Sequence, residues 1–401
     1  ILAPNFAHFN TLPITRPLMD MGYKVEHLPP PNRQSVELGL KYTNNEISYP
    51  GIILVGDVIK ALQSGKYNTE EITVGISQTG GQCRDSCYLS LFKKALVSAG
   101  FGDVPVVSLA TNLNPLNEQP GLEINYAMLA YKLLMGIVYT DALSNMYHIS
   151  AIREVNKGSA LKLADHYLAY MEEGQMPLNP GSVLAALEKA VEGFNRLETH
   201  DKDFPKAAIV GEIYVKLNSF GNNNVVNWLM DQGIEVLVPP LTEYFTSKFV
   251  NMDADVEKHP TRPGLMWLVY HGAEAYVQHF LDQAEKILAK FKHYRPNHHI
   301  RHIAETASEI IDLTNHYGEG WLISGEIGSM VKEGVPNILC LQPFGCIANH
   351  VVAKGVEKRM KERYSDLNIL FLDADAGTSE VNFQNRLYFF VNHARETFAS
   401  Q

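Results

Sequence analysis

Short and long apolar runs alternate along most of the chain, and this alternation predicts an α/β protein. The short runs have the length of β-strands, whereas in the longer ones apolar residues recur every three or four positions, the spacing of one helix face. Over residues 1–120, strands are predicted at 1–6, 23–28, 72–77 and 106–109, and helices at 12–21, 33–42, 51–62 and 89–99. Strands separated by helices in this way predict one doubly wound domain.

The pattern changes twice in the rest of the chain. From 121 to 204, Ala, Leu, Met and Tyr recur at helical spacing without a strand candidate, which predicts a helical bridge. The alternation resumes over 205–401, with strands predicted at 207–210, 234–238, 337–341 and 368–372, and helical segments at 224–232, 241–316, 324–333, 347–364 and 379–398. Ser324 is the expected N-cap of the helix at 324–333. The predicted fold is therefore two Rossmann-like, doubly wound domains joined by a helical section.

Composition excludes some classes of partner. The chain has 401 residues, a formal net charge of −10, and no cluster of Lys and Arg interleaved with aromatic residues, so nucleic-acid binding is not expected. No apolar run approaches the roughly 20 residues that span a bilayer, and no signal peptide opens the sequence, so we expect a cytoplasmic protein without a membrane partner. The chain begins at Ile1 in a strand-like run, which suggests a piece of a longer polypeptide.

Two cysteine-containing turns carry the candidate chemistry. Cys83 and Cys87 follow a glycine-rich turn between a predicted strand and a predicted helix, and Cys340 and Cys346 flank a similar turn late in the chain. Backbone N–H groups near a helix N-terminus favour the thiolate, the form of cysteine that binds metal. Together the two turns would make a metal or iron–sulfur site. A structural zinc site is the main competitor, but the cysteine spacing is wider than in a usual zinc knuckle.

Both turns lie at carboxyl ends of predicted parallel strands, where ligands bind in open α/β sheets. Two domains that face each other would place these turns across a shared cleft. The residues expected to line it are Gln78, Gly80, Gly81, Arg84, Glu212, Asn349 and His350. For any one of these turns, the alternative is that its polar residues only cap a helix.

Several ordered motifs together resemble the activase-related proteins of the 2-hydroxyacyl-CoA dehydratase group, a family that includes double-cubane cluster proteins. The motifs are Pro4-Asn5-Phe6, residues 44–50, Gln78-Thr79-Gly80-Gly81 with Cys83-Arg84, Gly211-Glu212-Ile213-Tyr214, residues 341–346 with Asn349-His350, and Ser379-Glu380-Val381-Asn382. The resemblance covers nearly the whole chain. It implies two flavodoxin-like domains, with an iron–sulfur cluster, [4Fe-4S] or larger, held by cysteines in the cleft between them. It also implies an ATP-hydrolysing activase that supplies low-potential electrons.

The resemblance suggests Cys83 and Cys346 as cluster ligands. Cys87 stands where the family more often has Asn, and we expect it to be the third ligand, in a slightly shifted position. Ser48 stands where the family is expected to have a cysteine, so it offers an oxygen ligand or marks a degraded site. Cys340 lies within a predicted strand, where a buried inert thiol is at least as expected as a ligand. We found no phosphate-binding loop with its lysine, so ATP hydrolysis is left to the partner.

The functional hypothesis is the electron-accepting component of an ATP-dependent reductase or 2-hydroxyacyl-CoA dehydratase-like system, with catalytic residues unassigned. Acyl-CoA or another small molecule would be its substrate. The alternative from another class is a cluster-free scaffold, or a domain that binds acyl-CoA or another ligand, within a larger polypeptide.

Overall fold

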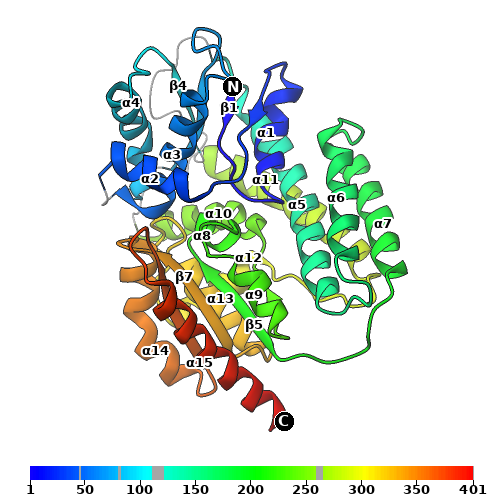
Figure 1. Cartoon of the computed structure of the whole chain (residues 1–401). Coiled ribbons are helices and arrows are strands. Elements are labelled where there is room, and N and C mark those ends of the chain that lie inside the picture. The colour runs from blue at the N-terminus through cyan, green and yellow to red at the C-terminus, as the bar shows by residue number, and fades with distance from the viewer. Residues whose placement is uncertain (45–46, 80–82, 111–121, 259–264, 401) are drawn as a thin grey trace.

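The computed structural model describes residues 1–44, 47–79, 83–110, 122–258 and 265–400. In this part of the chain, two four-stranded parallel sheets are covered by helices, and a helical layer stands beside them (Figure 1). The predicted α/β class, with two sheets and helices between their strands, is confirmed at this level. The domain boundaries at 120 and 204 stay predictions.

The first sheet has the strand order β2-β1-β3-β4. Its strands are β1 (Leu2–Ala3), β2 (Glu26–His27), β3 (Val74–Gln78) and β4 (Val106–Ala110). Four helices accompany it: α1 (Thr11–Asp20), α2 (Arg33–Tyr42), α3 (Tyr49–Gln63) and α4 (Tyr88–Ser98). Helices α2 and α3 pack so closely that a Cβ on Gly56 would lie only 1.6 Å from the Ser35 carbonyl oxygen, so this position requires glycine. This contact fixes α3, whose first residues border the candidate site.

The second sheet repeats the topology in the order β6-β5-β7-β8. Its strands are β5 (Lys206–Gly211), β6 (Glu235–Leu237), β7 (Asn337–Pro343) and β8 (Asn368–Ala374). All seven residues of β7 are buried, as expected for a central parallel strand covered on both faces. Both short helices after β5, α8 (Ile213–Leu217) and α9 (Val225–Asp231), and the C-terminal helix α15 (Glu380–Ala399) belong to this half.

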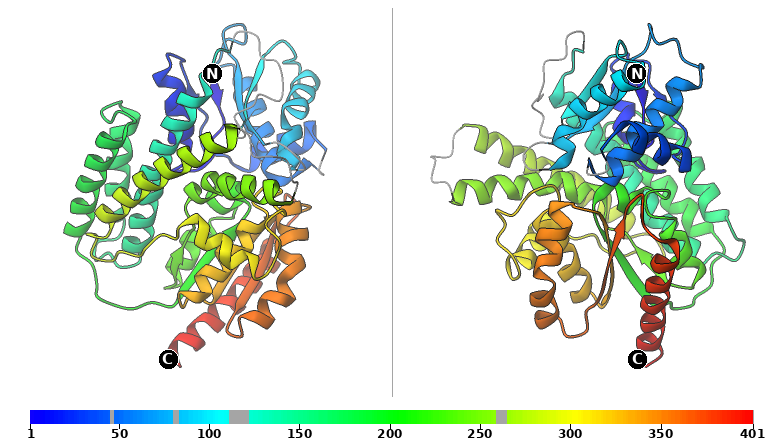
Figure 2. Two further views of the ribbon diagram at one scale, coloured as in Figure 1. Left: turned by 180° about the vertical axis from the view of Figure 1, so that it is seen from behind. Right: turned by 60° about the vertical axis from the view of Figure 1, so that its left-hand side comes forward.

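The predicted helical bridge consists of α5 (Tyr126–Ala151), α6 (Ser159–Glu172) and α7 (Pro180–Arg196). Its core also contains residues from other parts of the chain, namely Phe9 and Leu12 near α1, and Phe280, Ala284 and Ile287 of α11 (Leu265–Leu288). Helix α11 thus leaves the second half of the chain and packs beside α7 (Figure 2). Periodicity predicted that these segments are helical, but not which layer α11 joins.

Three predicted helical segments differ from the structure in detail. The segment 241–316 forms three helices, α10 (Leu241–Lys258), α11 and α12 (Ile300–Ser308). Ser324 is not an N-cap. Helix α13 (Trp321–Lys332) starts earlier, because Gly320 adopts φ +48° and turns the chain there, which leaves Ser324 buried inside the helix.

The segment predicted as one helix at 347–364 is divided. It begins as a π-helical segment η3 (Ile347–Ala353), passes through a 3-10 turn η4 (Lys354–Val356), and ends as α14 (Glu357–Arg363). At its start the Asn349 side chain donates to the Leu341 carbonyl oxygen at 3.3 Å, which ties the first turn to β7. Helical periodicity alone reveals neither this long-range bond nor the division of the segment.

Candidate functional site

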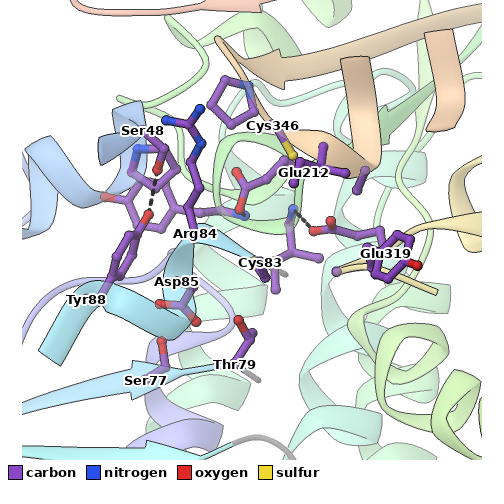
Figure 3. Close-up of a pocket in the computed structure, with 18 of the residues that line it drawn as sticks. Ser48, Ser77, Thr79, Cys83, Arg84, Asp85, Tyr88, Glu212, Glu319 and Cys346 are labelled. Atoms are coloured by element: carbon purple, nitrogen blue, oxygen red, sulfur yellow. Dashed lines mark hydrogen bonds between the residues drawn. The ribbon is translucent and has the colours of Figure 1, made fainter. Parts of the chain in front are cut away.

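One cavity lies where the strand order reverses in both sheets. In the first sheet, β2 lies on one side of β1, and β3 lies on the other side; in the second sheet, β6 and β7 flank β5 in the same way. The strand order therefore reverses between β1 and β3 and between β5 and β7. Parallel sheets bind ligands at this point, beyond the carboxyl ends of the strands. Residues that follow these four strands line a cavity of about 800 Å³, its open mouth included; they are Phe6, Thr79, Cys83, Glu212 and Cys346 (Figure 3).

The cavity brings together the two predicted cysteine-containing turns. Cys83 precedes a 3-10 turn, η2 (Arg84–Cys87), and Cys346 is the N-cap of η3; both line the cavity. Cys87 is exposed and does not line this cavity. Cys340 is fully buried in β7, where its sulfur accepts a hydrogen bond from Asn349 at 3.7 Å. The structure therefore places Cys83 and Cys346 at one site and Cys340 in the core.

The expectation that a helix N-terminus favours thiolates at this site is not met. Burial raises the pKa of the Cys83 thiol to about 11, and the charge of Glu319 adds to the increase, while a hydrogen bond from Thr79 opposes it. Burial likewise raises the pKa of Cys346, with Glu319 and Glu212 as further causes. The desolvation of sulfur and the nearby carboxyl groups thus raise the thiol pKa more than the short helical turns after each cysteine lower it.

Three carboxyl groups share the cavity with the thiols. Glu212 accepts backbone hydrogen bonds from Tyr214 at 3.0 Å and Val215 at 2.8 Å, and thereby caps α8. Even so, burial and the charge of Glu319 raise the pKa of Glu212 to about 8. Burial raises the pKa of Asp85 to about 7, again with a contribution from Glu319. Near neutral pH Glu212 is therefore mostly protonated and can donate a hydrogen bond, whereas Asp85 is protonated about half of the time.

Glu319 and the residues around it were not identified from the sequence. Glu319 is buried, and one of its carboxylate oxygens accepts the Ile213 backbone N–H at 2.9 Å, drawn as a dashed line in Figure 3. The available signal was its position between Gly318 and Gly320, which both have positive φ and turn the chain sharply at this point. Lys248 was also missed. Burial lowers its pKa, while the charges of Glu319 and Cys83 oppose that decrease.

Ser48 lines the cavity and has an unusual backbone. Its φ is +119°, in a region that residues with a Cβ rarely adopt, and it immediately precedes α3. The Ser48 hydroxyl forms a 2.6 Å hydrogen bond with the buried Tyr88 hydroxyl (Figure 3). Strain of this kind is typical of functional sites, where surrounding structure holds a residue in place.

Among the other predicted cleft residues, some line the cavity and others do not. Arg84 lines the cavity, close to Gly345. Gln78 is buried and donates to the Ser86 carbonyl oxygen at 2.6 Å, so it supports the first turn. Asn349 is buried against β7, and His350 lies 2.9 Å from Asp373 without lining the cavity. Gly80 and Gly81 lie outside the described residues.

A separate group of possible metal ligands is formed by side chains of α10 and α11. Among the described residues, the three side chains Asp253, His271 and Glu274 are the ones that place their ligand atoms within 4.8 Å of one another. The Arg301 guanidinium contacts Asp253 and Glu274 at 2.6 Å each. Arginine therefore supplies the positive charge that a metal ion would otherwise provide.

Comparison of the chain with protein-family models and with curated proteins gives no match. Within the part of the chain that is described, none of the helices has the length and apolar character needed to span a bilayer.

Proposed function

We propose that this chain is the iron–sulfur cluster-bearing component of an ATP-dependent reductase or 2-hydroxyacyl-CoA dehydratase-like system, which accepts low-potential electrons from a partner activase. The observation that carries the proposal is that Cys83 and Cys346, from equivalent turns of two sheets, line one cavity. Flavodoxin-like domains, a cytoplasmic location and an acyl-CoA or other small-molecule substrate belong to the same proposal.

The cavity fits a cluster in part. Cys83 and Cys346 would supply thiolate ligands from opposite sheets, and Ser48 offers a hydroxyl from the start of α3. Cys87, the third expected ligand, is exposed and outside the lining, so its role rests only on its place beside Cys83 in the sequence. When bound, the cluster would supply a site that accepts one electron.

The protonated carboxyl groups are compatible with an anionic cluster. Glu212, with a pKa of about 8, holds its proton at neutral pH, and further negative charge nearby would raise that pKa more. Glu212 and Asp85 would then face the cluster or a substrate as neutral donors. Proton donors beside an electron-accepting group suit reductions and dehydrations, which need a proton at the reacting oxygen.

The test is the iron and acid-labile sulfide content, with an ultraviolet–visible spectrum, of protein purified without oxygen. We expect about four irons per chain and a broad sulfur-to-iron absorption band. Cys83→Ala and Cys346→Ala should each lose most of the iron, whereas Cys340→Ala, a matched change in the core, should keep it. Iron-free protein in which Cys83 and Cys346 react as ordinary free thiols would contradict the proposal.

The second candidate is a cluster-free cleft that binds acyl-CoA or another ligand, or serves as a scaffold within a larger polypeptide. It is favoured by the raised pKa of Cys83, about 11, and by the position of Cys87 outside the cavity. Calorimetric titration of iron-free protein with acetyl-CoA separates the two forms of this candidate. Saturable binding that Arg84→Ala weakens would support the ligand-binding form, and the absence of binding would leave the scaffold.

A further inference from the structure

A second cavity lies away from the cysteines, between the helical layer and the second sheet. It has a volume of about 1150 Å³ with its open mouth, and α5, α10, α11 and residues 291–300 surround it. Much of its wall is apolar and is formed by Val138, Ala142, Met146, Leu281, Ala284 and Leu288. Polar side chains interrupt this wall along α11, in residues 294–299, and where α5 meets the start of α10.

Two buried carboxyl groups lie at that meeting point. Asp141 of α5 accepts hydrogen bonds from the Thr242 backbone N–H at 2.8 Å and the Thr242 hydroxyl at 2.7 Å. Glu243, the next residue of α10, is only 5% exposed, and its Oε2 atom has no hydrogen-bond partner. Glu243 lines the cavity, so this buried and unpartnered acceptor lies in the cavity wall.

The positive charge beside Glu243 is already paired. Behind it, Lys216 of α8 and Glu326 of α13 form a buried ion pair at 3.3 Å, and the Oε2 atom of Glu326 also has no partner. Lys216 therefore already has a carboxylate of its own. Burial and the charge of Glu326 hold the pKa of Glu243 well above its usual range, with Lys216 opposing and Asp141 and Glu333 adding to the shift. A cation in the cavity would relieve this imbalance.

The remaining charged residues of the lining do not supply that cation. The Arg295 guanidinium lies 2.7 Å from the buried carboxylate of Glu235, which it shares with Arg153. The two acidic residues contributed by α11 are engaged, since Gln278 donates to Asp282 at 2.7 Å and the Asn297 backbone N–H donates to Glu285 at 2.9 Å. The unpartnered Glu243 oxygen beside an apolar wall thus sets the chemistry of this cavity.

We propose that this cavity binds a primary ammonium group carried on an apolar body. The ammonium group occupies the space at Glu243 Oε2, within reach of Asp141, and the apolar body lies against α5 and α11. A primary ammonium has three donors and no acceptor, so it satisfies lone acceptor oxygens without bringing a further one. The site is independent of the cysteine-lined cavity and of the function proposed for it.

The test uses calorimetric titration of the whole chain at pH 8 with methylammonium, propylammonium and pentylammonium chloride. We expect saturable binding of pentylammonium, and an affinity that rises about threefold to fourfold for each added methylene group buried. Hexanoate and 1-pentanol, which have the same five-carbon apolar body without the cation, should bind at least tenfold more weakly. No saturable binding of pentylammonium, or equal affinity for methylammonium and pentylammonium, would overturn the proposal.

A matched pair of variants locates the ammonium group. Glu243→Gln keeps the shape of the side chain and removes its ability to ionise when the ammonium binds, and it should weaken pentylammonium binding at least tenfold. Glu257→Gln makes the same change at an exposed position of α10 and should leave binding unchanged. Potassium chloride is the last control, because an effect as large as that of pentylammonium would indicate a metal-cation site and contradict the proposal. If Glu243→Gln does not fold, the chain-length series on the unaltered protein still decides.

Discussion

The two halves of the molecule share a strand order but differ in how firmly they hold their cysteines. In the second half, β7 pairs with β8 over seven residues, from Asn337 to Pro343, and Cys346 follows directly on this buried strand. In the first half the equivalent pair, β3 with β4, covers five positions. Strand β1 has two residues and pairs with β3 at a single position, Leu2 with Val74, whereas β5 and β7 pair at four. The same topology is therefore built on longer ladders in the second half than in the first.

In the first half, side-chain hydrogen bonds support the turn that contains Cys83. The Gln78 side chain donates to the Ser86 carbonyl oxygen, and the Ser86 hydroxyl donates to the Cys83 carbonyl oxygen at 2.5 Å, which closes the turn around Cys83. Backbone ladders form part of a cooperative core, whereas side-chain bonds in a turn act locally. Substitutions in the second half should therefore affect global stability, and those in the first half should affect mainly the site.

The largest effect is expected from Gly211→Ala at the end of β5. Gly211 has φ +122°, and a Cβ there would lie 1.9 Å from the Leu341 carbonyl oxygen of β7. The backbones of the two central strands would have to separate, so the free energy of unfolding should fall by more than about 3 kcal/mol. Urea denaturation followed by circular dichroism measures this change.

Gly233→Ala is the matched control for this prediction. Gly233 also has positive φ, +74°, but no atom lies within 4 Å of its added Cβ. The substitution therefore costs only the free energy of holding an alanine at positive φ, about 1–2 kcal/mol. Equal losses for the two variants would show that the close contact of β5 and β7 is not what stabilises the second half.

The pH dependence of stability tests the carboxyl groups between the halves. Because the pKa of Glu212 is raised from 4.5 to about 8 in the folded protein, the folded state binds more protons than the unfolded chain between these values. Stability should therefore fall as the pH rises from about 5 to 8, by at most about 1.4 kcal/mol per pH unit for one proton. Denaturation in urea at several pH values gives this slope.

Glu212→Gln cannot ionise, so its stability should fall less steeply over the same pH range. It gives up one of the two acceptors for the α8 backbone, which lowers stability by a similar amount at every pH and leaves the comparison of slopes intact. Glu70→Gln, at an exposed position, should keep the slope of the unaltered protein. Identical slopes for Glu212→Gln and the unaltered chain would mean that Glu212 is ionised in the cleft.

Periodicity predicted the elements because it records which face of each segment is buried. Helix α2 occupies the predicted range, Arg33–Tyr42, where Asn32 forms a capping box with Ser35. The position of both cysteine turns at carboxyl ends of predicted strands also predicted that Cys83 and Cys346 share a cleft, and both line one cavity. Long-range packing is not encoded in this way, so the association of α11 with the helical layer was missed. Glu319 was missed for the same reason, since it reaches the cavity from a glycine-flanked turn.

The smallest expected effect concerns the strained residue of the first half, Ser48. Ser48→Ala removes the hydrogen bond to Tyr88 and keeps a Cβ at φ +119°, so it should destabilise the protein by about 1 kcal/mol or more. Ser48→Gly removes the same bond but relieves the backbone strain, and should be about 1 kcal/mol more stable than Ser48→Ala. At Ser90, exposed within α4, the order should reverse, because glycine costs about 0.5–1 kcal/mol relative to alanine in a helix. Urea midpoints of the four variants measure both differences. If alanine is the more stable residue at both positions, Ser48 is not strained, and the first half holds its site without stored backbone energy.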